Sequence, residues 1–204
     1  LKPLAEDALS LPVRTGKARV IGIEPASLVT KSLVREVKTD DAGCFQSALN
    51  PGLTKIAVIE RHKRTGKLGI GILEGYGLTG GAIATTISHD SHNIVVAGDN
   101  DPDMLLAVRE LADMGGGIVS VHGGAIRRLP LPIAGLMTSA DPQEVNAVLH
   151  DMLVAARAEL GIPEDVEPFM TLSFMALPVI PELKLTARGL FNVNTFSFVG
   201  VEAD

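Results

Sequence analysis

Apolar, β-branched runs separated by short turn sequences occupy much of the first hundred residues, and this pattern predicts a series of strands. Val, Ile and Leu dominate the runs, while Gly, Pro, Asp and Asn lie between them, as is typical of strands joined by turns. The expected strands are residues 18–23, 28–37, 55–61, 68–73 and 94–96, with a shorter β-branched stretch at residues 82–87.

Two later stretches have the spacing of amphipathic helices. Residues 101–114 carry apolar side chains three and four positions apart until a run of glycines ends the pattern. Asp101 is the expected N-cap of this helix and Pro102 its first helical residue. Residues 142–160 follow Asp141, have an acid in the capping-box position, and keep a continuous apolar face to their end.

The remaining apolar stretches predict further strands. Residues 118–121 and 126–129 form two short runs, and Pro130 indicates that the second lies at a sheet edge. The tail at residues 170–199 is apolar and broken by prolines, which predicts one or two more strands. Because strands outnumber the two main helices and do not alternate with them, we expect an α+β fold with mixed or antiparallel sheets.

Length and composition bound the organisation of the chain. Its 204 residues are enough for a single domain with its own core. Residues 1–17 are polar and contain prolines, so we expect them to be a linker or leading segment to a domain at 18–204. Because the sequence starts at Leu1 rather than Met, we expect it to be a segment of a longer protein.

Charge and hydropathy argue against two classes of partner. The formal charge is −6 with acids and bases interspersed, whereas nucleic-acid binding needs clustered Lys and Arg. The chain has no apolar run near the ~18 residues of a membrane span. The single cysteine, Cys44, cannot form an internal disulfide, so we expect a cytoplasmic protein.

A polar cluster lies between the strands expected at residues 82–87 and 94–96, and we expect it on a turn or strand end. The cluster comprises His89, Asp90, Ser91, His92 and Asn93. Together with His122, the two histidines and the carboxylate have the donor types of a metal site. They also suit acid–base catalysis, because histidine titrates near neutrality. The alternative is a structural turn whose side chains satisfy backbone groups.

Other local patterns predict structure rather than chemistry. Residues 75–80 match the Gly-x-Gly-x-x-Gly pattern of dinucleotide-binding turns, but that pattern must open a helix. The short β-branched stretch at 82–87 leaves no room for one, so we expect these glycines to serve tight turns. Residues 99–103 superficially resemble a calcium loop, but Pro102 interrupts the ligand run and helix capping is expected instead.

Three segments carry a likeness to a known family. They are Gly80–Ala84 running into His89–Asn93, Leu129–Met137, and Ala176–Thr186. In this order they resemble the C-terminal domain of bacterial adenine deaminase, and the resemblance runs from about Arg19 to Val199. The sequence differs from the family's pattern at Ala187 and Asn192, where acids are expected.

The resemblance implies an enzyme of the amidohydrolase superfamily that acts in purine salvage and hydrolyses adenine to hypoxanthine and ammonia. In that family a (β/α)8 barrel precedes this domain and holds iron or manganese, which activates the attacking water. Such barrels typically need about 250 residues, so the resemblance places the metal outside this segment. We therefore expect the isolated chain to be inactive, and the full enzyme to be a homo-oligomer.

The resemblance also implies a place for the polar cluster, at the mouth of the preceding barrel. On this interpretation His89, Asp90 and His92 are candidate catalytic residues, Ser91 and Asn93 are candidate adenine-binding residues, and none is a metal ligand. The competing interpretation is that the turn only stabilises the domain. Two hypotheses from other classes are a non-catalytic small-molecule-binding domain and an oligomerisation domain.

Overall fold

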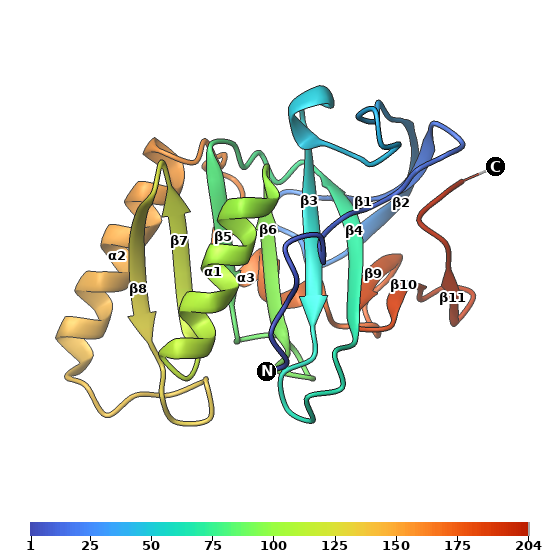
Figure 1. The fold of residues 1–204 in the computed structure, drawn as a ribbon. Coiled ribbons are helices and arrows are strands. Elements are labelled where there is room, and N and C mark those ends of the chain that lie inside the picture. The colour runs from blue at the N-terminus through green and yellow to red at the C-terminus, as the bar shows by residue number, and fades with distance from the viewer. Residues whose placement is uncertain (204) are drawn as a thin grey trace.

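The computed structural model describes residues 1–203, in which a mixed eight-stranded sheet carries helices on both faces (Figure 1). Its strands, in spatial order, are β2 (Thr30–Glu36), β1 (Lys17–Ile23), β4 (Leu68–Glu74), β3 (Leu53–Ile59), β6 (Ile94–Gly98), β5 (Gly81–Thr85), β7 (Gly117–His122) and β8 (Ala125–Pro130). Neighbouring strands are antiparallel except β1 and β4, which are parallel. The α+β prediction is confirmed, as is the edge position of β8.

Three helices and a small second sheet cover the large sheet. Helix α1 (Asp101–Asp113) packs on one face against β5, β6 and β7. The other face is covered by α2 (Pro142–Ala158), α3 (Pro168–Phe174) and a small sheet. The small sheet consists of β9 (Leu183–Thr186), β10 (Gly189–Asn192) and β11 (Ser197–Val199). A short 3-10 helix, η1 (Ser47–Leu49), precedes β3. The central strands are buried on both faces, which explains their continuous apolar sequences.

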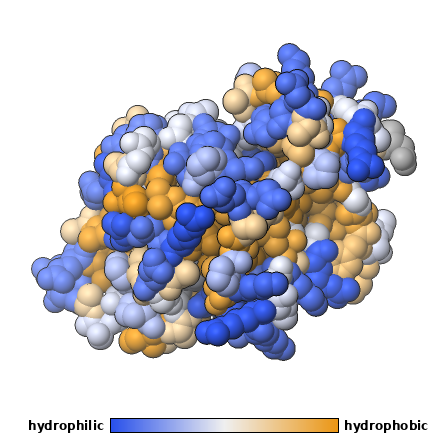
Figure 2. Space-filling model, viewed as in Figure 1, coloured by the Kyte–Doolittle hydropathy of each residue, from blue (hydrophilic) through white to orange (hydrophobic). Residues whose placement is uncertain are grey.

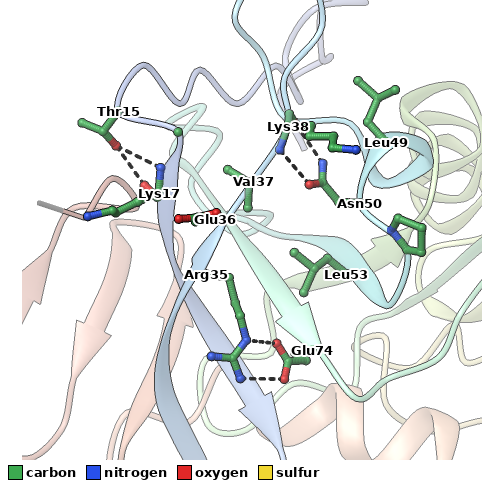
Figure 3. Close-up of a pocket in the computed structure, with 12 residues that line it drawn as sticks. Thr15, Lys17, Arg35, Glu36, Val37, Lys38, Leu49, Asn50, Leu53 and Glu74 are labelled. Carbon is green, nitrogen blue, oxygen red and sulfur yellow. Dashed lines mark hydrogen bonds and ion pairs between the residues drawn. The ribbon is translucent and has the colours of Figure 1, made fainter.

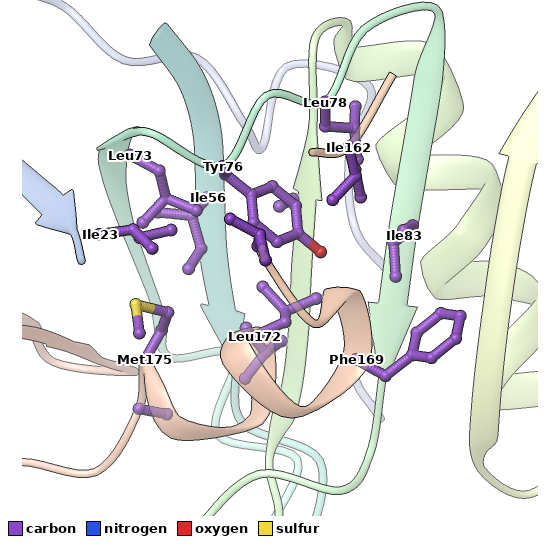
Figure 4. Packing of buried hydrophobic residues seen from close by; sticks show 14 of the residues in the cluster. Ile23, Ile56, Leu73, Tyr76, Leu78, Ile83, Ile162, Phe169, Leu172 and Met175 are labelled. Atoms are coloured by element: carbon purple, nitrogen blue, oxygen red, sulfur yellow. The ribbon is translucent and has the colours of Figure 1, made fainter. Parts of the chain in front are cut away.

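Tyr76 lies at the centre of the core between the sheet and α3 (Figure 4). Its ring is completely buried, and its hydroxyl donates a hydrogen bond to the carbonyl of Pro168 at 2.9 Å. The ring contacts the strand side chains and the helix in one cluster, with Leu172 and Phe169 contributed by α3. This packing holds α3 against the middle of the sheet.

The first 16 residues, within the segment expected to be a linker or leading segment, pack onto the face that carries α1. Leu9 is completely buried among side chains of this face, and Leu11 and Val13 are buried beside β1. Figure 2 shows apolar residues gathered in a central band on this face, with hydrophilic residues around it. Lys17 then begins β1, so the segment joins the core without regular secondary structure of its own.

The start of α1 differs from the prediction. Asn100, not Asp101, is the N-cap: its Oδ1 accepts a hydrogen bond from the backbone N–H of Asp103 at 2.9 Å. Asp101 instead pairs with the buried Lys55, with Oδ1 and Nζ 2.5 Å apart. The cap of α2 follows the prediction, because the Asp141 carboxylate accepts from the N–H of Gln143 at 2.7 Å.

The tail also differs from the one or two strands predicted for residues 170–199. Residues 168–174 form α3, which starts behind Glu167 as its N-cap, and three short strands follow. The local signal for this helix is Glu167 followed by Pro168, an acceptor side chain before proline at the first helical position. The apolar character of the segment hid this signal, because a short buried helix and a buried strand have similar composition.

The glycines at residues 75–80 form a loop between β4 and β5, as predicted. Gly75, Gly77 and Gly80 have φ values of +89°, +76° and +75°, which glycine adopts readily. The strand β5, rather than a helix, follows them. The Asp99 carboxylate accepts from the N–H of Gly80 at 2.5 Å and so closes the loop.

Candidate functional site

The polar cluster lies on the turn between β5 and β6, as predicted. Figure 1 shows this turn at the lower edge of the sheet, together with the loops that follow β3 and β8. We call residues 88–93 the histidine turn and residues 131–137 the β8 loop. The antiparallel order β3-β6-β5-β7-β8 brings all three connections to one edge.

His89 is positioned by α3. Its backbone N–H donates to the carbonyl of Ser173 at 3.1 Å, and its ring stacks on Phe174 with centroids 4.5 Å apart and planes inclined by 30°. The ring borders an open apolar pocket of about 400 Å³ whose walls include Leu149 and Phe169. The end of α3 therefore determines where this imidazole lies.

His92 is held by its backbone. Its φ is +47°, its N–H donates to the carbonyl of Ser88 at 2.6 Å, and its carbonyl accepts from Nε of Arg61 at 2.5 Å. Its ring centroid lies 6.1 Å from that of His89, edge to face. Burial lowers the pKa of His92, and the positive charges of His89 and Arg61 lower it further. Asp90 opposes these effects, and the net shift favours the neutral form of the ring.

Three buried polar atoms of the turn have no hydrogen-bond partner within residues 1–203. They are Ser88 Oγ, His92 Nδ1 and Asn93 Oδ1. Asn93 is only 9% exposed and Ser88 is completely buried. Buried polar groups are nearly always paired, so these atoms, like Ser120 Oγ on β7, need a partner that the side chains and backbone of the described residues do not supply, and a buried water is one such partner. A ligand and a polar surface of another domain both meet that requirement.

The other two residues of the predicted cluster point to solvent. Asp90 and Ser91 are exposed. The Ser91 carbonyl lies 2.9 Å from Nε2 of His62, on the loop after β3. Asp90 makes no salt bridge with another described residue at 4.0 Å or less.

The prediction that groups His122 with the histidine turn is wrong. In the antiparallel pair of β5 and β7, Gly81 lies opposite His122 and Thr85 opposite Ile118. His122 is thus level with the start of β5, whereas the turn follows its end, about 13 Å away at the usual rise of a strand. His122 Nδ1 instead lies 2.8 Å from the carbonyl of Gly80. Residues 1–203 hold no group of three or more His, Cys, Asp or Glu suited to a metal ion.

Arg61 is the site residue that sequence reasoning missed. Its Nη2 donates to the carbonyl of Ala134 in the β8 loop at 2.6 Å, while its Nε holds the histidine turn. Two of the three segments that carry the family resemblance therefore meet at this side chain. Arg61 lies at the end of a predicted strand, and no local pattern shows which distant carbonyls its side chain reaches.

A larger groove of about 680 Å³ lies at the other end of the sheet, beside β1 and β2 (Figure 3). Several of its polar groups are paired with one another. Arg35 makes two hydrogen bonds to the Glu74 carboxylate, at 2.6 and 2.9 Å, and the Asn50 side chain bonds both backbone groups of Lys38 at 2.8 Å. The groove contains none of the predicted site residues.

Comparison with known proteins places the chain in a family. The family model described as the adenine deaminase C-terminal domain matches residues 27–197. The chain belongs to this family. An adenine deaminase of Nitratidesulfovibrio vulgaris (strain Hildenborough) is 59% identical over 202 residues, covering 98% of this chain and 35% of that protein.

Two further relatives agree. Adenine deaminase 2 of Carboxydothermus hydrogenoformans is 48% identical over 202 residues, and the adenine deaminase of Clostridium acetobutylicum is 44% identical over 200 residues. Each alignment covers 98% of this chain and 35% of the relative. The chain therefore spans about a third of the length of the curated relatives it matches. No helix within residues 1–203 has both the length and the apolar character needed to cross a bilayer.

Proposed function

We propose that this chain is the C-terminal domain of an enzyme that hydrolyses adenine to hypoxanthine and ammonia. The family match and the names of its relatives support this proposal. The remaining two thirds of such an enzyme would supply an amidohydrolase barrel and its iron or manganese, whose chemistry is to lower the pKa of a bound water. The described residues offer no ligand set for that metal, so this domain contributes contacts and shape.

Within that enzyme, we propose that the histidine turn closes the active site over adenine. The unpaired atoms His92 Nδ1 and Asn93 Oδ1 are the observation that carries this role. Adenine offers an exocyclic amine that donates and ring nitrogens that accept. When the turn opens slightly, the Asn93 carbonyl oxygen can accept from the amine and the His92 ring can bond a ring nitrogen, whereas the completely buried Ser88 hydroxyl stays out of reach.

The surroundings of the turn support contact with a preceding domain. Ile133 and Met137 of the β8 loop are 47% and 57% exposed, and both are available to pack against a partner surface. The N-terminus lies near the same edge (Figure 1), and Lys2 packs close to Gly66 in the loop after β3. A preceding domain would thus join the chain beside the turn.

We further propose a cytoplasmic homo-oligomeric enzyme of purine salvage, on the basis of the single cysteine and the exposed apolar side chains.

The test is adenine turnover by the full-length enzyme, measured as ammonia release, in His92→Ala and Asn93→Ala variants. We expect kcat/KM for adenine to fall by about tenfold or more in each, because a buried polar contact to the substrate is lost. His150→Ala, in an exposed position of α2, is the matched control and should leave turnover unchanged. Wild-type kinetics in both turn variants would instead favour a purely structural turn.

A second measurement separates the domain from the whole enzyme. The 204-residue chain, supplied with iron or manganese and adenine, should release no ammonia. Turnover by this chain alone would overturn the proposal and assign the chemistry to the histidine turn itself.

A further inference from the structure

Arg61 connects two loops that lie far apart in the sequence. The guanidinium donates from Nε to the carbonyl of His92 at 2.5 Å and from Nη2 to the carbonyl of Ala134 at 2.6 Å. Its planar fork suits two acceptors at fixed angles, whereas the single ammonium of a lysine does not. The side chain is half-buried at the junction.

The β8 loop is shaped to receive this guanidinium. Gly135 has a φ of +75°, and a Cβ there would lie 2.7 Å from Nη2 and 2.9 Å from Nη1 of Arg61. The loop is also fixed from the sheet side, because the Thr86 hydroxyl donates to the Gly135 carbonyl at 2.6 Å and accepts from the N–H of Gly117 at 2.8 Å. Arg61 therefore binds the histidine turn to a rigid support.

The turn needs that support at His92. Its left-handed φ of +47° is costly for a residue with a side chain and persists only when the surroundings hold it. The Arg61 bond acts on the carbonyl of this same residue, so it also sets the direction in which the chain leaves toward Asn93. The unpaired atoms His92 Nδ1 and Asn93 Oδ1 lie on either side of the held peptide.

We infer that Arg61 is a positioning residue, which orients His92 and Asn93 toward adenine by binding the His92 carbonyl to the β8 loop. This inference rests on the proposed function. Arg61 itself acts through the turn, so its loss displaces the substrate contacts without removing any of them. A displacement of about 1 Å at such contacts typically costs up to about 100-fold in kcat/KM.

The experiment compares Arg61→Lys and Arg61→Gln in the full-length enzyme with Arg128→Lys. Arg128 lies on β8 and pairs with Glu110 of α1, with Nε and Oε2 2.6 Å apart, so it is an ion-paired arginine away from the turn. We expect kcat/KM for adenine to fall by about 10- to 100-fold in both Arg61 variants. Most of the loss should lie in KM, with a melting temperature close to that of the wild type, and Arg128→Lys should match the wild type.

Two results would overturn the inference. One is wild-type kcat and KM in Arg61→Lys while His92→Ala loses activity; this leaves the proposed function intact. The other is an unchanged KM with kcat reduced in proportion to the folded fraction, which would make Arg61 a stabilising residue only. Wild-type kinetics in the His92 and Asn93 variants as well would mean that the proposed function itself fails.

Discussion

Lys55 and Asp101 form an ion pair beneath the first turn of α1, with Nζ and Oδ1 2.5 Å apart. The Lys55 side chain is 2% exposed and the Asp101 side chain 24%. The ammonium also donates to the carbonyl of Leu9 at 3.0 Å. One lysine thus joins β3, α1 and the N-terminal segment.

Breaking this pair should destabilise the domain. Asp101→Asn leaves the Lys55 ammonium buried without its counter-charge, and we expect the free energy of unfolding in urea to fall by about 2–4 kcal/mol. Asp151→Asn is the control, because Asp151 pairs with Arg127 at 3.3 Å but is 71% exposed. That change should cost less than about 1 kcal/mol. Equal losses in the two variants would contradict the role given to the Lys55 pair.

The Tyr76 hydroxyl should contribute measurably to stability. Tyr76→Phe keeps the ring but leaves the Pro168 carbonyl without its donor in a dry core. We expect a loss of about 1–2 kcal/mol in urea unfolding. Far-ultraviolet circular dichroism, which does not depend on the replaced tyrosine, checks that the variant stays folded. A variant as stable as the wild type would show that the bond contributes no net free energy.

The buried Lys184 should make the folded domain more stable as the pH rises into the alkaline range. Burial lowers the pKa of its ammonium to about 8, and its Nζ donates to the carbonyl of Leu28 at 2.8 Å. The unfolded chain, with a pKa near 10.5, then binds more protons than the folded one between pH 8 and 10.5. The free energy of unfolding therefore rises with pH across this window.

The comparison variant for this effect is Lys184→Met, which keeps the length of the side chain and removes the titrating group. The difference in stability, wild type minus variant, should increase by roughly 2–3 kcal/mol between pH 7.5 and pH 10. Other titrating groups are common to both proteins and cancel in the difference. A difference that stays constant with pH would show that Lys184 titrates normally.

Gly69 allows the small sheet to sit directly on β4. A Cβ at Gly69 would lie 2.1 Å from the carbonyl oxygen of Thr186 and 2.9 Å from the nitrogen of Gly189, both backbone atoms. Gly69→Ala should therefore displace β9 and β10 and cost about 1–3 kcal/mol. Gly71→Ala is the matched control, because its nearest neighbour is the movable Leu190 side chain at 3.3 Å. A larger loss at Gly71 than at Gly69 would contradict this account.

Local patterns predicted the elements well but not how they meet. The β-branched runs, the prolines at the starts of α1 and α2 and the polar residues at 89–93 are local signals, and each predicted an element or turn that the structure contains, whereas the signal for α3 was missed. The parallel pairing of β1 with β4, at Ile21 with Leu73 and Gly22 with Glu74, is not local, because β2 and β3 lie between the two strands in the sequence. Spatial order of this kind depends on the packing of the whole sheet.

In the candidate site, too, local sequence predicted the turn but not its contacts with distant residues. His89 to Asn93 lie together because they are adjacent in sequence, and the pattern predicted their turn. The grouping with His122 was wrong because it rested on residue type alone. The register of β5 and β7 places His122 at the end of β7 that lies away from the turn. The role of Arg61 could not be predicted from the sequence, because its partners are main-chain carbonyls, which every residue has.

The packed N-terminal segment has a consequence for how this domain would work beside another. Leu9, Leu11 and Val13 are buried against the sheet, so the chain from Leu9 to β1 adds no flexible length between the sheet and a preceding domain. Each flexible residue removed from such a connection raises the effective concentration of the histidine turn at its partner surface. Weak contacts, such as those that the exposed Ile133 and Met137 would make, then hold the turn at that surface for more of the time than they would at the end of a flexible tether.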